Sequence, residues 1–116
     1  MLFLCYSKCS TCRKARKWLD EKGVSYQVRD IREQRPTEAE LRAWAELGGL
    51  DVRKLFNTSG QQYRALDLKN RLPAMTGDEM FALLATDGML VKRPILVTEK
   101  TALAGFREET WEEAIK

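Results

Sequence analysis

Two cysteines separated by two residues are the side chains of this chain best suited to chemistry. The segment Cys9-Ser10-Thr11-Cys12-Arg13 follows an apolar run over residues 1–6 and precedes apolar residues at helical spacing: Ala15, Trp18 and Leu19. A thiol at the start of a helix faces the positive end of the helix dipole and unpaired backbone N–H groups. Both effects, and the positive charge of nearby basic residues, favour the thiolate, which is the nucleophilic form. The spacing therefore predicts a redox pair in which Cys9 attacks and Cys12 closes a disulfide on it.

Other interpretations of the two thiols need different surroundings. A structural zinc site takes about four ligands, whereas the chain has no His and only one further cysteine, Cys5. A structural disulfide across two residues would close a very small loop and add little stability. Two inert, buried cysteines remain an alternative. The strand–loop–helix context favours the redox pair.

The elements that would position the thiols can be traced along the chain. Residues 2–6 predict a buried strand, with Cys5 as a small buried hydrophobe, and a helix over about 11–22 follows, ended by Gly23. Residues 24–31 predict a second strand. A strand, a helix and a parallel strand in this order form a right-handed βαβ unit.

The middle and the end of the chain predict further elements. Thr37 with Glu40, and Thr76 with Glu79, are capping-box pairs that should each begin a helix. Short helical turns over 51–56 and 63–68 flank a polar loop at 57–60. Two apolar runs, 93–97 and 102–106, predict a β-hairpin, and a last helix over 108–115 should turn Trp111 and Ile115 inward.

Length and composition predict one domain over residues 1–116. The formal charge of +3 results from 20 basic residues interspersed with 17 acidic ones, so no direct nucleic-acid partner is expected. No stretch approaches the ~20 apolar residues of a membrane span, so no membrane partner is expected either. Three cysteines without an export signal indicate a cytoplasmic, reducing location.

The motifs together resemble the ArsC/Spx family of arsenate reductase-like proteins. The matching segments are Cys9-Ser10-Thr11-Cys12-Arg13-Lys14-Ala15, Tyr26-Gln27-Val28-Arg29-Asp30-Ile31, Arg93-Pro94-Ile95-Leu96-Val97 and Gly105-Phe106. The resemblance implies an α/β, thioredoxin-like fold. In this fold a four-stranded mixed sheet is flanked by helices, with a helical insert between the βαβ and ββα halves. It also implies a cis Arg93–Pro94 bond facing Cys9, although sequence alone gives such a bond only a base rate of ~5%.

The resemblance also bears on substrates. The family's arsenate reductases bind the oxyanion with three arginines, of which only Arg93 is matched here. Asn57 and Phe106 fall at the other two positions, and Arg107 follows one residue later. Losing two guanidiniums removes bidentate, charge-assisted contacts with a tetrahedral anion. The Cys-X-X-Cys pair is instead similar to the Spx branch, whose members are redox-sensing transcription regulators that bind RNA polymerase.

We therefore predict a thiol–disulfide oxidoreductase with Cys9 as nucleophile and Cys12 as resolving thiol. Arg13 is expected to favour the thiolate, and Arg93 and Pro94 are expected to border the substrate. Glutathione, as a co-substrate, or glutaredoxin or thioredoxin would act as reductant, with no tightly bound cofactor and no metal. The alternatives are an Spx-like regulator that binds RNA polymerase and a glutathione-dependent arsenate reductase.

Overall fold

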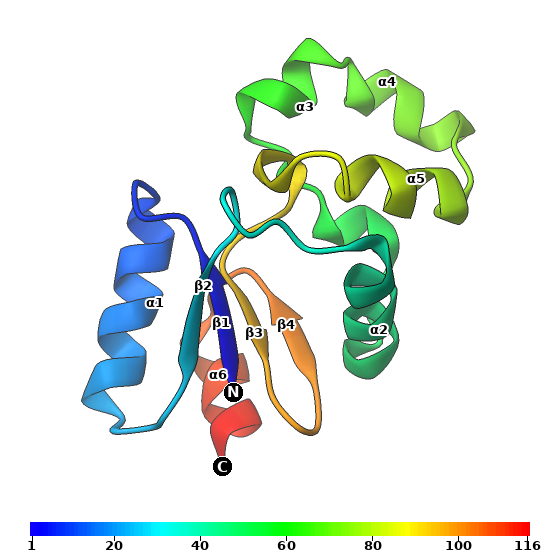
Figure 1. The fold of residues 1–116 in the computed structure, drawn as a ribbon. Helices are drawn as coiled ribbons and strands as arrows, with labels where there is room; N and C mark the ends of the chain where they lie inside the picture. The colour runs from blue at the N-terminus through cyan, green and yellow to red at the C-terminus, as the bar shows by residue number, and fades with distance from the viewer.

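The computed structural model describes residues 1–116, and a four-stranded mixed sheet lies at its centre (Figure 1). The strand order is β2-β1-β3-β4. Strand β1 pairs in parallel with β2 and antiparallel with β3, and β3 pairs antiparallel with β4. The fold is therefore the predicted βαβ and ββα halves joined into one sheet. The strands are β1 (Leu2–Cys5), β2 (Gln27–Asp30), β3 (Ile95–Val97) and β4 (Ala102–Ala104).

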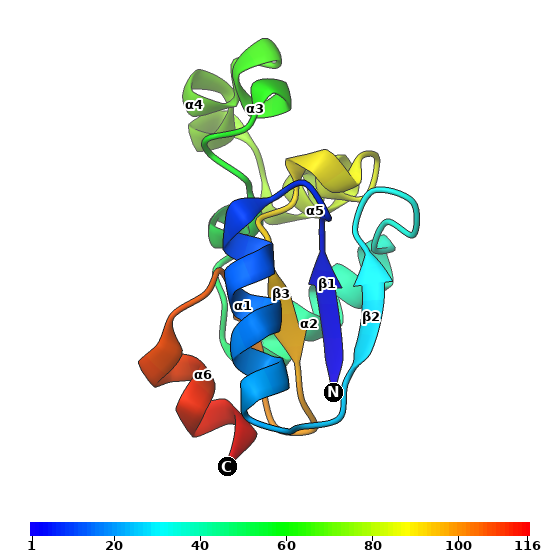
Figure 2. The ribbon, with the colours of Figure 1, turned by 90° about the vertical axis from the view of Figure 1, so that its left-hand side faces the viewer.

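Two helices, α1 (Ser10–Glu21) and α6 (Glu108–Ile115), cover one face of the sheet (Figure 2). Helix α1 turns Cys12, Ala15 and Leu19 toward the sheet, which is the spacing of one helix face. They join a buried cluster with residues of β1, β3 and α6: Phe3, Cys5, Leu96 and Trp111. Cys12 is thus anchored in a core, and Cys5 is buried among apolar side chains as predicted.

The other face of the sheet packs against α2 (Glu38–Gly48), and a helical insert lies beyond the carboxyl end of β1 (Figure 1). Both predicted capping boxes are formed, with Thr37 and Glu40 at the start of α2 and Thr76 and Glu79 at the start of α5. The buried side chains here include Leu41, Trp44 and Ala45. The insert comprises α3 (Gln61–Ala65), α4 (Leu68–Arg71) and α5 (Gly77–Leu84), with 3₁₀ turns at Val52–Leu55, Leu72–Ala74 and Gly88–Leu90.

Two predicted elements differ from the structure by more than their last residues. The strand expected over 24–31 begins only at Gln27, whose N–H bonds the Met1 carbonyl oxygen, because β1 offers no pairing partner before that point. The helical turn expected over 63–68 is divided between α3 and α4. Asp67 separates them with a left-handed backbone, φ 52°, which no helix can continue.

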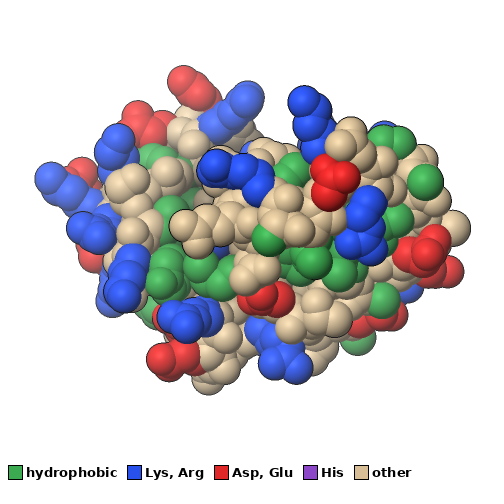
Figure 3. All heavy atoms as spheres, turned by 90° about the horizontal axis from the view of Figure 1, so that it is seen from above, with side chains coloured by type: hydrophobic (Ala, Val, Ile, Leu, Met, Phe, Trp, Pro, Cys, Tyr) green, Lys and Arg blue, Asp and Glu red, His purple; other side chains and the backbone are tan.

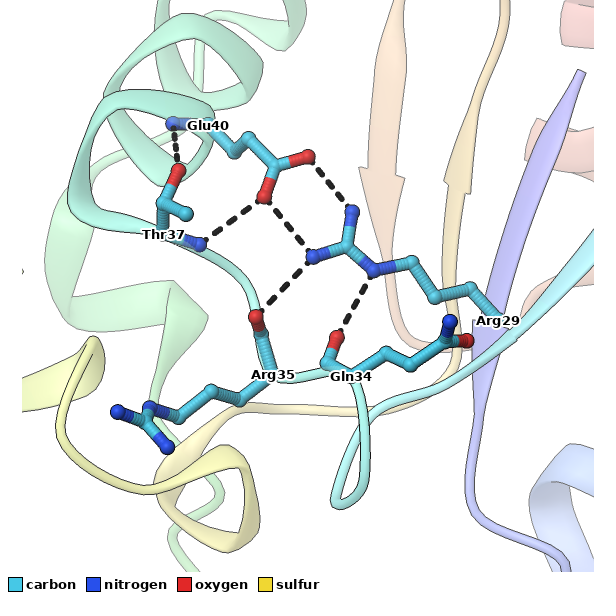
Figure 4. Close-up of polar contacts among 5 residues, drawn as sticks. All are labelled: Arg29, Gln34, Arg35, Thr37 and Glu40. Atoms are coloured by element: carbon cyan, nitrogen blue, oxygen red, sulfur yellow. Dashed lines mark hydrogen bonds and ion pairs between the residues drawn. The ribbon is translucent and has the colours of Figure 1, made fainter.

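Arg29 of β2 joins the sheet to the loop that leads into α2 and to the first turn of that helix (Figure 4). Its guanidinium donates to both carboxylate oxygens of Glu40, at 2.6 and 2.9 Å, and to the carbonyl oxygens of Gln34 and Arg35, at 2.8 and 3.1 Å. The same carboxylate accepts from the Thr37 N–H at 3.0 Å. The hydrogen bond from Arg29 opposes the effect of partial burial and lowers the pKa of Glu40 to about 2.

Replacing Glu40 by Gln should therefore lower the free energy of unfolding most at neutral pH. Because the folded pKa lies below the unfolded value of ~4.3, the stabilisation is present above that value. It is lost as the pH falls toward 2. We expect Glu40→Gln to lower the free energy of unfolding at pH 7 by about 1–2 kcal/mol, a figure reduced for solvent screening because the side chain is 34% exposed.

Urea unfolding at pH 7 and at pH 3 measures this loss, and Glu46→Gln on the exposed side of α2 is the matched control. The difference between wild type and Glu40→Gln should shrink at pH 3. A difference that is equal at both pH values would show that Glu40 is not held as a carboxylate by Arg29.

Candidate active site

The loop between β1 and α1 places Cys9 at the N-cap of the helix, immediately before Ser10. The Cys9 N–H donates to the Tyr6 carbonyl oxygen at 3.0 Å, and the Cys9 carbonyl oxygen accepts from the Arg13 N–H at 3.1 Å. These bonds close the loop and fix an extended backbone at Cys9, φ −91° and ψ 121°. The Cys9 thiol is half-buried, whereas Cys12 is 2% exposed. An incoming disulfide can therefore reach Cys9 but not Cys12.

The surroundings of Cys9 favour its thiolate. Partial burial raises the pKa, but polar contacts with the backbone N–H and thiol of Cys12, and the guanidinium of Arg93, outweigh it, so the pKa lies below its ordinary value. The Cys9 side chain makes no capping hydrogen bond of ordinary geometry. No single capping hydrogen bond therefore accounts for the lowered pKa of Cys9, which results from its contacts with Cys12 and Arg93 together.

Cys12 has the opposite tendency. Burial is the largest cause, and the neighbouring Cys9 adds to it, so the pKa of Cys12 rises to about 12 although the Tyr6 N–H opposes the shift. That N–H donates to the Cys12 sulfur at 3.4 Å. The pKa values of the two thiols therefore differ in the direction expected for a nucleophilic thiol, Cys9, and a protonated resolving thiol, Cys12.

Arg93 lies beside the thiols, next to a cis peptide bond. The Arg93–Pro94 bond is cis, as the resemblance implied. The guanidinium carbon lies 5.2 Å from the centre of the Tyr6 ring, and Nη1 lies 4.0 Å from the Met89 sulfur. No carboxylate pairs with this guanidinium, since none of the ion pairs in the structure includes it. Its positive charge is therefore available to Cys9 and to a bound anion.

Arg13 is placed differently from Arg93. Its Nε donates to the Ser7 carbonyl oxygen at 3.2 Å, and its side chain lies on the exposed face of α1 with Arg16 and Lys17. The groups that lower the pKa of Cys9 are Cys12 and Arg93. The structure thus brings Cys9, Cys12, Arg93 and Pro94 together, and places the Arg13 guanidinium on the loop that precedes Cys9.

A cleft of about 1020 Å³ opens above Cys9, between the sheet half and the insert. Figure 3 views the molecule from above and shows blue Lys and Arg side chains on both sides of a hollow in this end. Asn57, Phe106 and Arg107 all line this cleft, so the positions compared with the reductases' arginines do lie near Cys9. Its other lining residues include Thr11, Arg32, residues 58–62, Asp87, Met89, Lys92 and Arg93.

Sequence reasoning missed Tyr6, Met89 and Lys92. Tyr6 contacts the site through its ring, its carbonyl oxygen and its N–H. Its place between a strand and the thiol motif was the one signal that could have indicated this role. Met89 and Lys92 gave no local signal, since only the fold brings residues 89–93 to the thiols.

The structure contains no group of three or more His, Cys, Asp or Glu side chains that could hold a metal ion. No helix combines the length and apolar character that crossing a membrane requires.

A dithiol at the start of the first helix and a cis proline just before β3, on a four-stranded mixed sheet flanked by helices, are typical of the thioredoxin-like fold. Comparison of the sequence with models of known protein families narrows this class. The chain belongs to the ArsC family, whose model matches residues 4–114. It is 49% identical over 113 residues to YusI, an uncharacterised protein of Bacillus subtilis (strain 168), covering 97% of this chain and 96% of YusI.

Two further matches show the range of the family. A solved structure described as an ArsC family related protein from Bacteroides fragilis is 54% identical, with a TM-score of 0.95. The match covers 97% of this chain and 94% of that one. The regulatory protein MgsR of Bacillus subtilis (strain 168) is 29% identical over 106 residues, covering 91% of this chain and 82% of MgsR.

Proposed function

We propose that this protein is a thiol–disulfide oxidoreductase in which Cys9 is the nucleophile and Cys12 the resolving thiol. The observation that carries the proposal is the contrast between the thiols. Cys9 is accessible with a lowered pKa, and Cys12 is buried with a raised pKa. Inert structural cysteines need no such contrast, and the nearby unpaired guanidinium of Arg93 supports a catalytic interpretation.

In the first step the Cys9 thiolate attacks one sulfur of a substrate disulfide. A bond forms between Cys9 and that sulfur, and the other sulfur leaves as a thiolate with the electron pair of the broken bond. Arg93 lies where its charge can stabilise the departing thiolate. The product of this step is a mixed disulfide on Cys9.

In the second step Cys12 attacks the Cys9 sulfur and releases the remaining substrate thiolate. The pKa of Cys12 is raised by burial and by the charge and hydrogen bond of Cys9. Forming the mixed disulfide removes the negative charge of Cys9, so that contribution disappears and Cys12 loses its proton more readily. Overall, the substrate disulfide is reduced to two thiols while Cys9 and Cys12 are oxidised to a disulfide.

A dithiol or two monothiols must then reduce the Cys9–Cys12 disulfide. We propose glutathione, glutaredoxin or thioredoxin as this reductant. Steady-state turnover of a mixed disulfide of glutathione, with each reductant in turn, tests the proposal. Turnover that requires Cys9 is expected, and no turnover with any reductant would contradict the enzyme assignment.

A second candidate function is a redox-controlled regulator that binds RNA polymerase. The observation that favours it is the 29% identity to the regulatory protein MgsR over 91% of this chain. In this function the same disulfide would report redox state without turnover. Capture of purified RNA polymerase on the immobilised protein, reduced and oxidised, distinguishes the two functions when set beside the turnover assay.

Arsenate should be a poor substrate. Arg93 and the exposed Arg107 border the cleft, but Asn57 and Phe106 provide no guanidinium there. Each lost charge-assisted hydrogen bond should weaken binding of a tetrahedral oxyanion by roughly 1.5–3 kcal/mol, or about ten- to hundredfold. Glutathione-coupled arsenate turnover measures this directly. Turnover comparable to that of a glutathione mixed disulfide would restore the arsenate reductase alternative.

A further inference from the structure

The cleft above Cys9 carries an excess of unpaired positive charge. Four of its lining side chains are cationic, and Asp87 is the only acidic one. The Asp87 carboxylate accepts a hydrogen bond from the Met89 N–H at 2.9 Å. One of its oxygens therefore caps the 3₁₀ turn at Gly88–Leu90. None of the four cations takes part in an ion pair: Arg32, Lys92, Arg93 and Arg107. A ligand with several negative charges would complement this surface.

The exposed Lys92 side chain lies against Gly105 at the edge of the cleft. Gly105 has φ +82°, and a Cβ built there would lie 2.9 Å from the Lys92 Cε and 3.6 Å from its Nζ. The Lys92 stem therefore lies across the Gly105 backbone. The Gly105 N–H bonds the Pro94 carbonyl oxygen at 2.8 Å, and its carbonyl oxygen accepts from Trp111 at 2.9 Å. The Lys92 stem therefore lies beside the end of β4, and Lys92, Arg93 and Gly105 line the same cleft.

The opposite wall is polar without being charged. It is formed by the loop at residues 57–60 and the first turn of α3, which together contribute five polar side chains: Asn57, Thr58, Ser59, Gln61 and Gln62. The one side-chain hydrogen bond to this loop comes from Arg64, which donates to the Ser59 carbonyl oxygen at 3.1 Å. The hydroxyls and amides are therefore free to bond amide groups of a ligand.

A volume of about 1020 Å³ far exceeds that of a single tetrahedral oxyanion and matches the upper range of pockets for small organic molecules. We propose that the cleft selects disulfides of low-molecular-weight thiols that carry several negative charges and amide groups. Lys92 and Arg107 would bind the anionic end, and the polar side chains of residues 57–62 would bind the amides. This inference rests on the proposed oxidoreductase function and adds the substrate class and a specificity residue, Lys92.

The test is the rate at which three disulfides oxidise the fully reduced protein, followed by intact-mass spectrometry of the Cys9–Cys12 disulfide. Glutathione disulfide supplies carboxylates, coenzyme A disulfide supplies phosphates, and bis(2-hydroxyethyl) disulfide is neutral. Each rate constant is divided by that for free dithiothreitol, which corrects for the intrinsic reactivity of the disulfide. This reaction needs no separate reductant.

At least one anionic disulfide should exceed the neutral one by tenfold or more. The advantage should shrink at high salt, because salt screens exposed charges. A gain for glutathione disulfide alone, or for coenzyme A disulfide alone, identifies carboxylate or phosphate as the recognised anion. Lys92→Met should reduce the ratio of anionic to neutral rates about tenfold. Lys100→Met, in the exposed turn between β3 and β4, should leave this ratio unchanged.

The experiment gives different results if the proposed substrate class is wrong and if the proposed oxidoreductase function is wrong. Oxidation of Cys9 by all three disulfides at equal corrected rates, or an unchanged ratio in Lys92→Met, would overturn the substrate class and leave the oxidoreductase function standing. If no disulfide formed a Cys9–Cys12 bond, both proposals would be wrong.

Discussion

Cys12→Ser is expected to accumulate a stable mixed disulfide on Cys9, whereas Cys9→Ser should form none and lose all disulfide turnover. Cys9 is the accessible thiol with the lowered pKa, so only it can begin the exchange. Without Cys12, nothing in the site displaces the bound substrate thiol. Intact-mass spectrometry after brief exposure to glutathione disulfide measures the adduct in both variants.

Cys5→Ser is the matched control, because Cys5 is also a free cysteine but is buried, with burial as the largest cause of its raised pKa. It should retain turnover and adduct formation, with some loss of stability from placing a hydroxyl in a core strand. An adduct in Cys9→Ser, or turnover by that variant, would contradict the assignment of the nucleophile.

Trp111→Ala should lower the free energy of unfolding by about 3–5 kcal/mol. Trp111 is fully buried between α1 and the sheet and makes edge-on contacts with Phe3, Trp18 and Phe106. Its indole N–H also donates to the Gly105 carbonyl oxygen, so the change should loosen one wall of the cleft. Urea unfolding measures the loss.

Trp111→Phe separates the two effects, because it keeps an aromatic ring and removes the hydrogen bond. It should cost about 1–2 kcal/mol, within the range of a lost hydrogen bond to a buried carbonyl and a partly filled cavity. A loss in Trp111→Ala no greater than that in Trp111→Phe would show that ring packing at this position contributes little.

Local signals predicted much of the fold. The capping boxes at Thr37 and Thr76 began helices as expected, because each pair satisfies backbone N–H groups within four residues. The hairpin of β3 and β4 and the last helix were also predicted, since each has its own apolar pattern. The break at Asp67 was not, because a left-handed Asp has no unambiguous sequence signal.

The site was only partly predictable, because its geometry depends on contacts between distant segments. The thiol pair and Arg93 were named from their motifs, whereas the ring of Tyr6 beneath Arg93 depends on how β1 and residues 89–93 meet. The requirement for glycine at position 88 also depends on a contact between distant segments. A Cβ there would lie 1.8 Å from the Ile31 carbonyl oxygen, so only glycine lets this border of the cleft approach the end of β2.

The pH dependence of alkylation at Cys9 tests the central claim most directly. Reduced wild-type protein is treated briefly with iodoacetamide over a range of pH, and peptide mass spectrometry assigns the label to Cys5, Cys9 or Cys12. Cys9 should be labelled first, with a midpoint below the ~8.5 of an unperturbed thiol, because thiolate is the reactive form. Labelling of Cys12 before Cys9, or a Cys9 midpoint at or above that value, would contradict the account.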